Sequence, residues 1–293
     1  MAACVVVFLA LSRSVVALQP SSSRSKTERV TLSSREGHWH HRASSSALHC
    51  KGALPVCAKQ QERAPTAEVI VSTFEEDLSW LADVDIGGNI TVYVHDRSEP
   101  RTHYGISPGD NLKAAKQSQV HLISMNPARR VPITFVDIPN VGDEASAYLS
   151  HITAHYEHLP EVMFFVHGHR CAKHATADMA GILDNRWRCF RPAAGYETLN
   201  DLYNQHVCPD MSSRKWVNEK RVAKIRAAWE LFEPELGPFP PSFCFDSYGQ
   251  FVVSRQRVLS HPRDFYLKLL DGVKAGKTTM EWFWRMLFVP RFQ

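Results

Sequence analysis

Residues 140–166 read NVGDEASAYLSHITAHYEHLPEVMFFV, and this stretch predicts the class of the fold. Asn140 is a residue type that caps helices, and the acids Asp143 and Glu144 suit a first helical turn because they face the positive end of the helix dipole. Apolar residues then recur at helical spacing up to a Leu-Pro step that ends the helix. The run at 162–166 is apolar throughout, as in a strand buried on both faces. A helix followed by such a strand favours a parallel pair with a right-handed crossover.

The chain on both sides of this stretch extends the same pattern. Runs rich in β-branched residues predict strands at 68–72, 89–95, 131–138 and 249–254. Helical spacing predicts further helices at 75–81, 220–232, 262–270 and 278–288. Strands that alternate with helices predict an α/β domain, with a mostly parallel or mixed sheet flanked by helices.

The first 66 residues differ in composition from the rest of the chain. They hold 9 Lys and Arg against 3 Asp and Glu, whereas the remaining residues hold 25 against 27. Residues 19–66 are rich in Ser, Arg and His, so they bury too little apolar surface to fold alone. We therefore predict a leader and linker at 1–66 and one domain at 67–293. The slightly acidic domain gives no electrostatic reason to bind nucleic acid.

Apolar residues near the start of the chain indicate a targeting signal. The run at 2–11 is too short to cross a bilayer and resembles the apolar part of a signal peptide, with small residues for cleavage near Ala17. The Ser- and Arg-rich stretch behind it is typical of a transit peptide. Together they predict the secretory pathway (Golgi or secreted) or a plastid, and no membrane span in the mature domain. An uncleaved tail on a cytosolic protein is the alternative.

The cysteines leave the redox state open. Three of the seven, Cys4, Cys50 and Cys57, belong to the predicted leader. The four in the domain could form two disulfides in an oxidising compartment or could stay as thiols: Cys171, Cys189, Cys208 and Cys244.

Histidines follow the buried strand at 162–166. His167 and His169 flank a glycine at its end, and His174 comes soon after. Ligands bind at strand ends in open α/β sheets, and residues two apart on an extended chain face the same way. Because imidazole is a good ligand for transition metals, the three histidines are a candidate metal site. Histidines that only make hydrogen bonds at a strand end are the alternative.

Glu281 is a candidate general base. It lies in the apolar, aromatic run EWFWRMLF at 281–288, where burial would raise the pKa of its carboxyl group. A structural role competes with this one, because Thr278 and Glu281 have the spacing of a capping box.

Several polar residues at strand ends are candidate substrate ligands. Glu75, Glu76 and Asp77 follow the first predicted strand and Asp96 the second, and their carboxylates could hydrogen-bond a ribose or a base. Gly249 and Gln250 open the late strand and could line a pocket, and Arg255 could bind a phosphate. Each has a structural alternative. The acids could serve the first turn of a helix or be solvated in a loop, Gly249 and Gln250 could form only a turn, and Arg255 could be an ordinary surface arginine.

Known nucleotide and hydrolase motifs are absent. The run GVKAGKT at 272–278 resembles a phosphate-binding loop, but only three residues separate its glycines where four are required. The chain also lacks the Gly-x-Ser-x-Gly and Gly-x-Gly-x-x-Gly patterns, which leaves serine hydrolases and Rossmann dehydrogenases without support.

An ordered set of segments resembles a eukaryotic family known only as a conserved domain of unknown function. The resemblance covers nearly all of residues 67–290 and carries no established activity. The segments are VIVSTFEEDLSWL at 69–81, the helical stretch at 140–160, MFFVHGH at 163–169, GYETLN at 195–200, GQFVVSRQRVLSHPRDFY at 249–266 and EWFWRMLF at 281–288.

The order of these elements is also similar to that of glycosyltransferases of the GT-A fold. In those enzymes an acid-bearing loop holds the nucleotide, and a buried strand ends in Asp-x-Asp, which binds a divalent cation on the diphosphate. His-Gly-His stands at that position here and favours softer metals than manganese or magnesium. The residues that fall in comparable order are Thr73, Asp77, Asp96, His167, His169, Gly249, Gln250 and Glu281.

This similarity implies a glycosyltransferase-like enzyme. It would use a nucleotide sugar as donor, a glycan or other hydroxyl compound as acceptor, and a divalent metal such as manganese or zinc. Two other functions remain open. One is a zinc-dependent hydrolase that uses the three histidines, and the other is a non-catalytic carbohydrate-binding domain.

Overall fold

The structure is a computed structural model of the chain. The described residues are 50, 63–74, 76–96, 132–171, 175, 177–200, 219–240, 249–278, 280 and 283–289.

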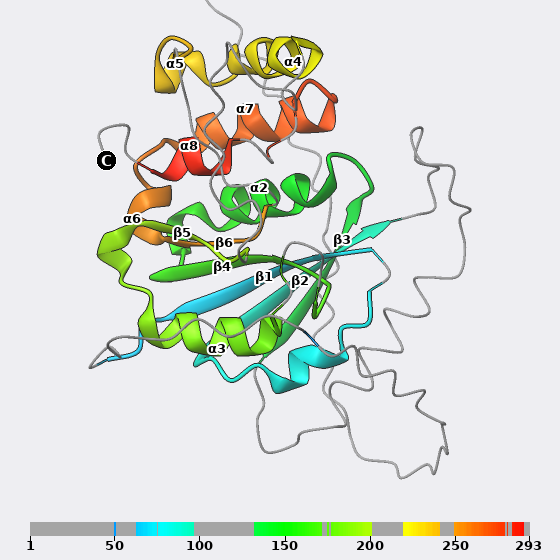
Figure 1. The fold of residues 1–293 in the computed structure, drawn as a ribbon, viewed down its shortest axis with the longest axis vertical. Coiled ribbons are helices and arrows are strands. Elements are labelled where there is room, and N and C mark those ends of the chain that lie inside the picture. The colour runs from blue at the N-terminus through cyan, green and yellow to red at the C-terminus, as the bar shows by residue number, and fades with distance from the viewer. Residues whose placement is uncertain are drawn as a thin grey trace, which may run out of the picture. The chain divides into compact units, whose positions relative to one another are not determined.

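Six strands form one mixed sheet in the order β3-β2-β1-β4-β6-β5 (Figure 1). Strands β3, β2, β1 and β4 are parallel to one another, and β6 runs antiparallel to both β4 and β5. The predicted α/β class with a mixed sheet is confirmed. The strands are β1 (Ala67–Thr73), β2 (Gly88–Asp96), β3 (Ile133–Pro139), β4 (Val162–His167), β5 (Tyr196–Thr198) and β6 (Phe251–Ser254).

The strand order reverses its direction between β1 and β4. From β1 the chain proceeds outward through β2 to β3, and it then returns to place β4 on the other side of β1. The crossover from β3 to β4 contains α2 (Asp143–His155) and η2 (Tyr156–His158), as the sequence predicts. At such a reversal the connections leave in opposite directions, which opens a crevice at the carboxyl ends of the two strands.

Helices cover both faces of the sheet, and each face has its own apolar core (Figure 1). On one face, buried side chains of α2 pack with those of α7 (Arg263–Lys274) and α8 (Trp284–Phe288). On the other face lie η1 (Ser79–Asp83) and α3 (Met179–Cys189). The remaining helices are η3 (Pro192–Ala194), α4 (Glu219–Trp229), α5 (Glu233–Leu236) and α6 (Arg255–Val258).

Two helix starts differ from the predictions. The cap of α2 is Gly142 in a left-handed conformation, with φ of 74°, and not Asn140. A Cβ at Gly142 would also lie 2.2 Å from a methyl group of Val273, so glycine is required for its φ and for its space. Among the described residues near the chain end, the α-helix begins only at Trp284, so the helix expected at 278–288 is shorter than predicted.

The helix expected at 75–81 is also wrong. A short 3₁₀ helix, η1, begins only at Ser79, because side chains of the preceding acids bond to the local backbone. The Asp77 carboxylate accepts hydrogen bonds from the N–H and the hydroxyl group of Ser79. Such local bonds compete with a regular helix.

A disulfide joins Cys50 to Cys171, so a cysteine of the predicted leader is bonded to the domain. Neither alternative that the sequence left open for the four domain cysteines, a pairing among themselves or free thiols, holds for Cys171. Cys189 is also disulfide-bonded, and its partner lies outside the described residues. In the part of the chain that the structure describes, no helix combines the length and the apolar character needed to cross a membrane.

Candidate functional site

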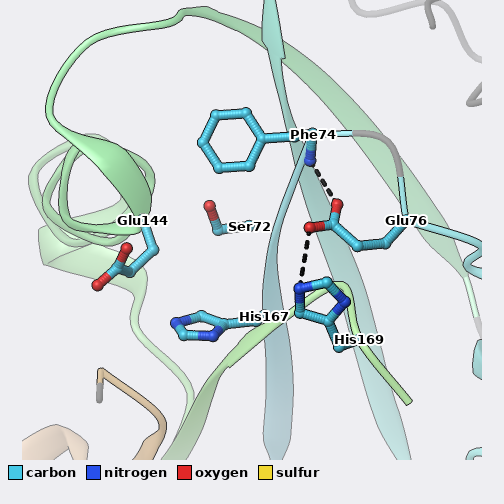
Figure 2. A pocket seen from close by; sticks show the side chains of 6 residues that line it. All are labelled: Ser72, Phe74, Glu76, Glu144, His167 and His169. Carbon is cyan, nitrogen blue, oxygen red and sulfur yellow. Dashed lines mark hydrogen bonds and ion pairs between the residues drawn. The ribbon is translucent and has the colours of Figure 1, made fainter. Parts of the chain in front are cut away.

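A cavity of about 150 Å³ lies at the carboxyl ends of β1 and β4, at the reversal of strand order (Figure 2). Side chains from β1, β4, the loops that follow them and α2 line it: Ser72, Phe74, Glu76, Glu144, His167 and His169. It therefore lies where open α/β sheets bind ligands.

Glu76 is held in place by the end of β1. One of its carboxylate oxygens, Oε2, accepts a hydrogen bond of 2.7 Å from the Thr73 hydroxyl group and one of 2.6 Å from the backbone N–H of Phe74. Gly168 makes room for this arrangement, because a Cβ there would lie 2.8 Å from the Thr73 hydroxyl oxygen and 3.0 Å from the Glu76 Cβ. The glycine between the two histidines thus lets the loop after β4 approach the loop after β1 closely.

The other oxygen of Glu76 faces an imidazole. Oε1 lies 3.4 Å from Nε2 of His169, whose side chain is 52% exposed (Figure 2). The second ring nitrogen of His169, Nδ1, has no hydrogen-bond partner in the described part of the chain. A carboxylate behind a half-exposed imidazole is an arrangement that orients a general base, because the carboxylate fixes the ring and stabilises its protonated form.

His167 is the more enclosed histidine of the pair. Burial and the neighbouring charge of His169 bring its pKa down to about 4, and the charges of Glu76 and Asp143 only partly oppose this shift. Its backbone N–H donates a hydrogen bond of 3.1 Å to the side-chain oxygen of Gln250. At neutral pH this histidine is therefore an uncharged wall of the cavity.

Ser72, Phe74 and His95 form a third group at the end of β1. The hydroxyl oxygen of Ser72 lies 2.9 Å from Nε2 of His95, and the His95 ring stacks on Phe74 with ring centroids 4.3 Å apart. Ser72 and Phe74 both line the cavity, so this stack fixes the orientation of an aromatic wall.

Glu144 reaches the cavity from the first turn of α2. Behind it, a Cβ on Gly249 would lie 3.1 Å from a Glu144 carboxylate oxygen and 3.1 Å from Nε1 of Trp284. Nε1 of Trp284 and the hydroxyl group of Tyr148 are buried, and within the described ranges neither has a hydrogen-bond partner. Burial and the charges of Glu144 and Glu76 raise the pKa of Tyr148. Two buried donors therefore lie on the α2 side of the site.

The structure brings together six of the residues predicted from sequence. Glu76, His167 and His169 line the cavity, Thr73 holds Glu76, Gln250 binds the backbone of His167, and Gly249 lies against Glu144. Gln250 is itself held by Asn200, whose side-chain oxygen accepts a bond of 3.2 Å.

The other predicted residues fall elsewhere or outside the described residues. Asp77 binds Ser79 and does not line the cavity, whereas its neighbour Glu76 does. Arg255 donates a hydrogen bond to the carbonyl oxygen of Leu159, which precedes β4, so it lies near the amino-terminal end of that strand, opposite the cavity. Asp96 ends β2, but its side chain, and all of His174 and Glu281, lie outside the described residues.

Glu144 and Ser72 were missed because each has a second, ordinary interpretation in the sequence. An acid in a first helical turn is expected to serve the helix dipole, and a serine within a β-branched run suggests only a strand. The alternation of side chains along β1 was the available signal, because Ser72 lies on the same face of β1 as buried Ile70.

The described residues do not form a complete metal site. No group of three or more His, Cys, Asp or Glu side chains among them is arranged to hold a metal ion. His174, the third predicted ligand, is not among these residues, so the three-histidine site stays a prediction.

A protein-family model described as "Protein of unknown function (DUF3431)" matches residues 69–291. The chain belongs to this family. The match spans most of β1, every later strand and both loops that build the cavity, which confirms the predicted resemblance to a family of unknown function. Comparison with curated proteins and with solved structures gives no match.

Proposed function

We propose that this protein is a glycosyltransferase-like enzyme that binds a nucleotide sugar at the carboxyl ends of β1 and β4. The observation that supports it is the convergence of Glu76, His167 and His169 on one cavity at the reversal of strand order. These residues come from the two loops that the similarity to GT-A enzymes assigns to donor binding. Thr73, Gly249 and Gln250, which that similarity also singles out, adjoin the same cavity.

In this proposal His169 takes a proton from the acceptor. The acceptor hydroxyl oxygen forms a bond to the anomeric carbon of the sugar, the bond from that carbon to the diphosphate breaks, and the hydroxyl proton moves to Nδ1 of His169. Glu76 supports the step because its carboxylate stabilises the imidazolium that results. His167 stays neutral and borders the sugar. Glu281 remains an alternative base, and its side chain lies outside the described residues.

The charge of the cavity bears on how the donor binds. Two carboxylates, those of Glu76 and Glu144, line it, and the neutral His167 does not offset them. A bare diphosphate would be repelled by these carboxylates. We therefore expect the donor to bind with a divalent cation such as manganese. Magnesium-type ions use one or two protein carboxylates together with substrate phosphates, a requirement that Glu144 fits while Glu76 stays with His169.

The proposed location is a compartment of the secretory pathway. The Cys50–Cys171 disulfide supports it, because structural disulfides persist in oxidising compartments and are rare in the cytosol. Mass spectrometry of the mature protein tests this proposal. We expect an N-terminus that precedes residue 50 and an intact Cys50–Cys171 peptide pair. A mature chain that starts after residue 50, or free thiols at both positions, would contradict it.

Ligand-induced stabilisation of the full chain tests the proposed function. UDP-sugars and GDP-sugars are added with and without Mn²⁺, beside free glycans and Zn²⁺ alone. A ligand at about 100 times its Kd stabilises by ~2.7 kcal/mol, which raises the melting temperature of a domain of this size by roughly 5–10 °C. We expect that rise for one class of nucleotide sugar, larger with Mn²⁺, and slow release of the nucleoside diphosphate.

Each other outcome favours a different function. Stabilisation by free glycans alone would indicate a carbohydrate-binding domain. Stoichiometric zinc in the purified protein, with no effect of nucleotide sugars, would indicate the hydrolase. Either result would overturn the proposal.

A further inference from the structure

The segment that carries His169 is fastened on both sides of that histidine. On the β4 side, the backbone of Gly168 is held twice. Its N–H donates a hydrogen bond of 2.9 Å to the carbonyl oxygen of Ser72, and its carbonyl oxygen accepts one of 2.7 Å from Nε1 of Trp80. The β4 side of His169 is therefore anchored by β1 and by η1.

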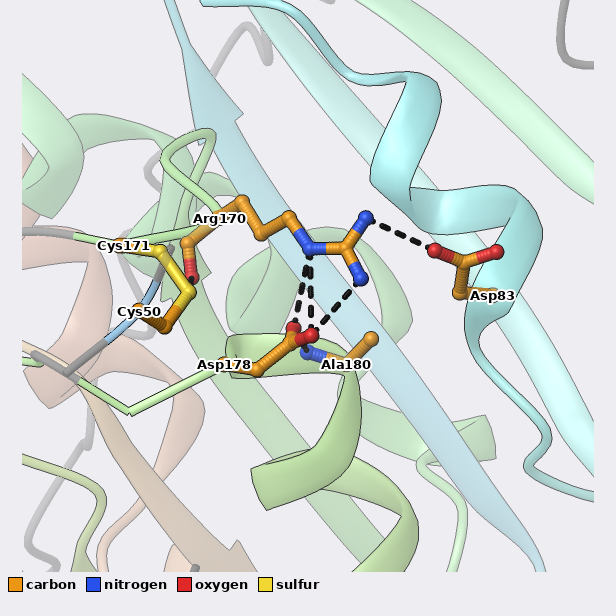
Figure 3. Close-up of a disulfide and its surroundings, with 6 residues drawn as sticks. All are labelled: Cys50, Asp83, Arg170, Cys171, Asp178 and Ala180. Atoms are coloured by element: carbon orange, nitrogen blue, oxygen red, sulfur yellow. Dashed lines mark hydrogen bonds and ion pairs between the residues drawn. A yellow bond between two sulfur atoms is a disulfide. The ribbon is translucent and has the colours of Figure 1, made fainter. Parts of the chain in front are cut away.

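On the far side of His169, Arg170 connects two elements of the α3 face (Figure 3). Its guanidinium group lies 2.8 Å from an Asp83 carboxylate oxygen in η1 and 2.7 Å from one of Asp178. Asp178 also caps α3, because its carboxylate accepts a bond from the N–H of Ala180. The carbonyl oxygen of Arg170 accepts a further bond from the N–H of Met179.

The last attachment is covalent. Cys171, two residues beyond His169, forms the disulfide with Cys50, and the α-carbons of the two cysteines are 5.6 Å apart (Figure 3). Both cysteines are partly exposed, so a thiol reagent can reach the bond. This disulfide links the segment of His169 to a part of the chain 121 residues earlier.

We propose that Arg170 and the Cys50–Cys171 disulfide are positioning elements for His169, and that reduction of the disulfide loosens the site. An added dithiol supplies two electrons and two protons, its own sulfurs become a disulfide, and Cys50 and Cys171 become thiols. The segment then keeps only its polar anchors, and His169 spends less time beside Glu76. The consequence for catalysis rests on the proposed function, whereas the change in mobility does not.

Hydrogen exchange measured by mass spectrometry tests the positioning directly. In oxidised full-length protein we expect slow exchange over residues 168–171. Cys50→Ser removes the disulfide and leaves the hydrogen bonds and ion pairs of Gly168 and Arg170 in place. It should speed exchange over residues 168–171 roughly tenfold. Cys171→Ser should do the same, and α7 should be unchanged in both variants. Cys189→Ser is the matched control, because it removes the other described half-cystine at the far end of α3 from Asp178.

A second measurement asks whether His169 itself moves. The ring signal of His169, assigned by its loss in His169→Asn, should shift in Glu76→Gln because the carboxylate faces the ring. In Cys50→Ser and in dithiol-reduced protein the signal should broaden or move toward its Glu76→Gln position. Arg170→Gln should add to the effect of Cys50→Ser.

Unchanged exchange at 168–171 together with an unmoved His169 signal in Cys50→Ser and Cys171→Ser overturns the inference, whatever the protein binds. If nucleotide sugars fail to bind the oxidised wild type while the exchange changes as expected, the proposed function fails and the positioning stands. A shift of exchange in Cys189→Ser as large as that in Cys50→Ser would also overturn it, because the effect would then be general.

Discussion

Two glutamate–histidine pairs occupy different settings in this protein. Glu76 and His169 lie at the cavity with a ring half in solvent, whereas Glu68 and His151 lie between the sheet and α2 with a fully buried ring. The nitrogen–oxygen distance is 3.4 Å in both pairs. The pairs therefore share their chemistry, and the difference between them lies in what else reaches the imidazole.

The buried pair is enclosed by protein groups. The hydroxyl oxygen of Tyr93 lies 3.2 Å from Nδ1 of His151, and Thr91 donates 2.6 Å to Glu68. Burial opposes ionisation of Glu68, but the hydrogen bonds and charges of His151, with the bond from Thr91, outweigh it and lower the pKa of this carboxyl group. Both ring nitrogens of His151 face protein groups, so no substrate reaches them. The contrast shows that the exposed imidazole ring of His169, and not the Glu–His pair itself, distinguishes the candidate site.

The largest expected effect is on catalysis at the open pair. His169→Ala removes the proposed base and should lower the rate of sugar transfer by ~10²–10⁴-fold, with Glu76→Gln less severe. Unfolding free energy should change by less than ~0.5 kcal/mol, because the ring is half exposed. His158→Ala and Glu157→Gln, exposed residues of η2, are the controls. Unchanged turnover in His169→Ala would assign the base elsewhere.

The buried pair should respond in the opposite way. His151→Leu leaves Glu68 buried without its ion-pair partner and should lower the free energy of unfolding by ~3–5 kcal/mol. The double variant Glu68→Leu/His151→Leu should recover much of that loss, because no charge is then stranded. Urea denaturation measures both, and the folded fraction should retain wild-type affinity for the donor. If the double variant is no more stable than His151→Leu, the stranded charge is not the cause of the loss, and the Glu68–His151 pair itself stabilises the fold.

The sequence predicted the fold better than the site, and the reason is physical. Apolar periodicity recurs over whole elements such as α2 and β4, so errors at single positions cancel. The site, in contrast, depends on single side chains. Glu76 lines the cavity because its carboxylate reaches Thr73, whereas the neighbouring Asp77 does not because its carboxylate reaches Ser79. The strand end at His167 was foreseeable because a parallel strand that is apolar throughout must end in the crevice.

A third expectation separates the two histidines of the cavity by pH. The pKa of His167 falls from an ordinary value of about 6.5 to about 4, so the unfolded state binds more protons between those values. The free energy of unfolding should therefore be flat above pH 6.5 and should fall by up to ~3 kcal/mol as pH drops toward 4. His167→Gln should remove most of this slope and leave the part due to His155, whose pKa burial and the charge of His151 also lower. His158→Gln should keep the whole slope. An identical slope in His167→Gln would show that another group causes the acid sensitivity.

The smallest effect is expected at Arg255, which the sequence suggested as a phosphate ligand. Its guanidinium group donates a hydrogen bond of 3.3 Å to the carbonyl oxygen of Leu159, near the amino-terminal end of β4 and away from the cavity, and Arg255 is exposed. Arg255→Ala should therefore cost under ~1 kcal/mol of stability and leave donor affinity within about twofold of wild type. Calorimetric titration with the nucleotide sugar that stabilises the wild type measures this. A tenfold loss of affinity would mean that the donor reaches the opposite edge, and the comparison between the open and the buried pair would then no longer locate the site.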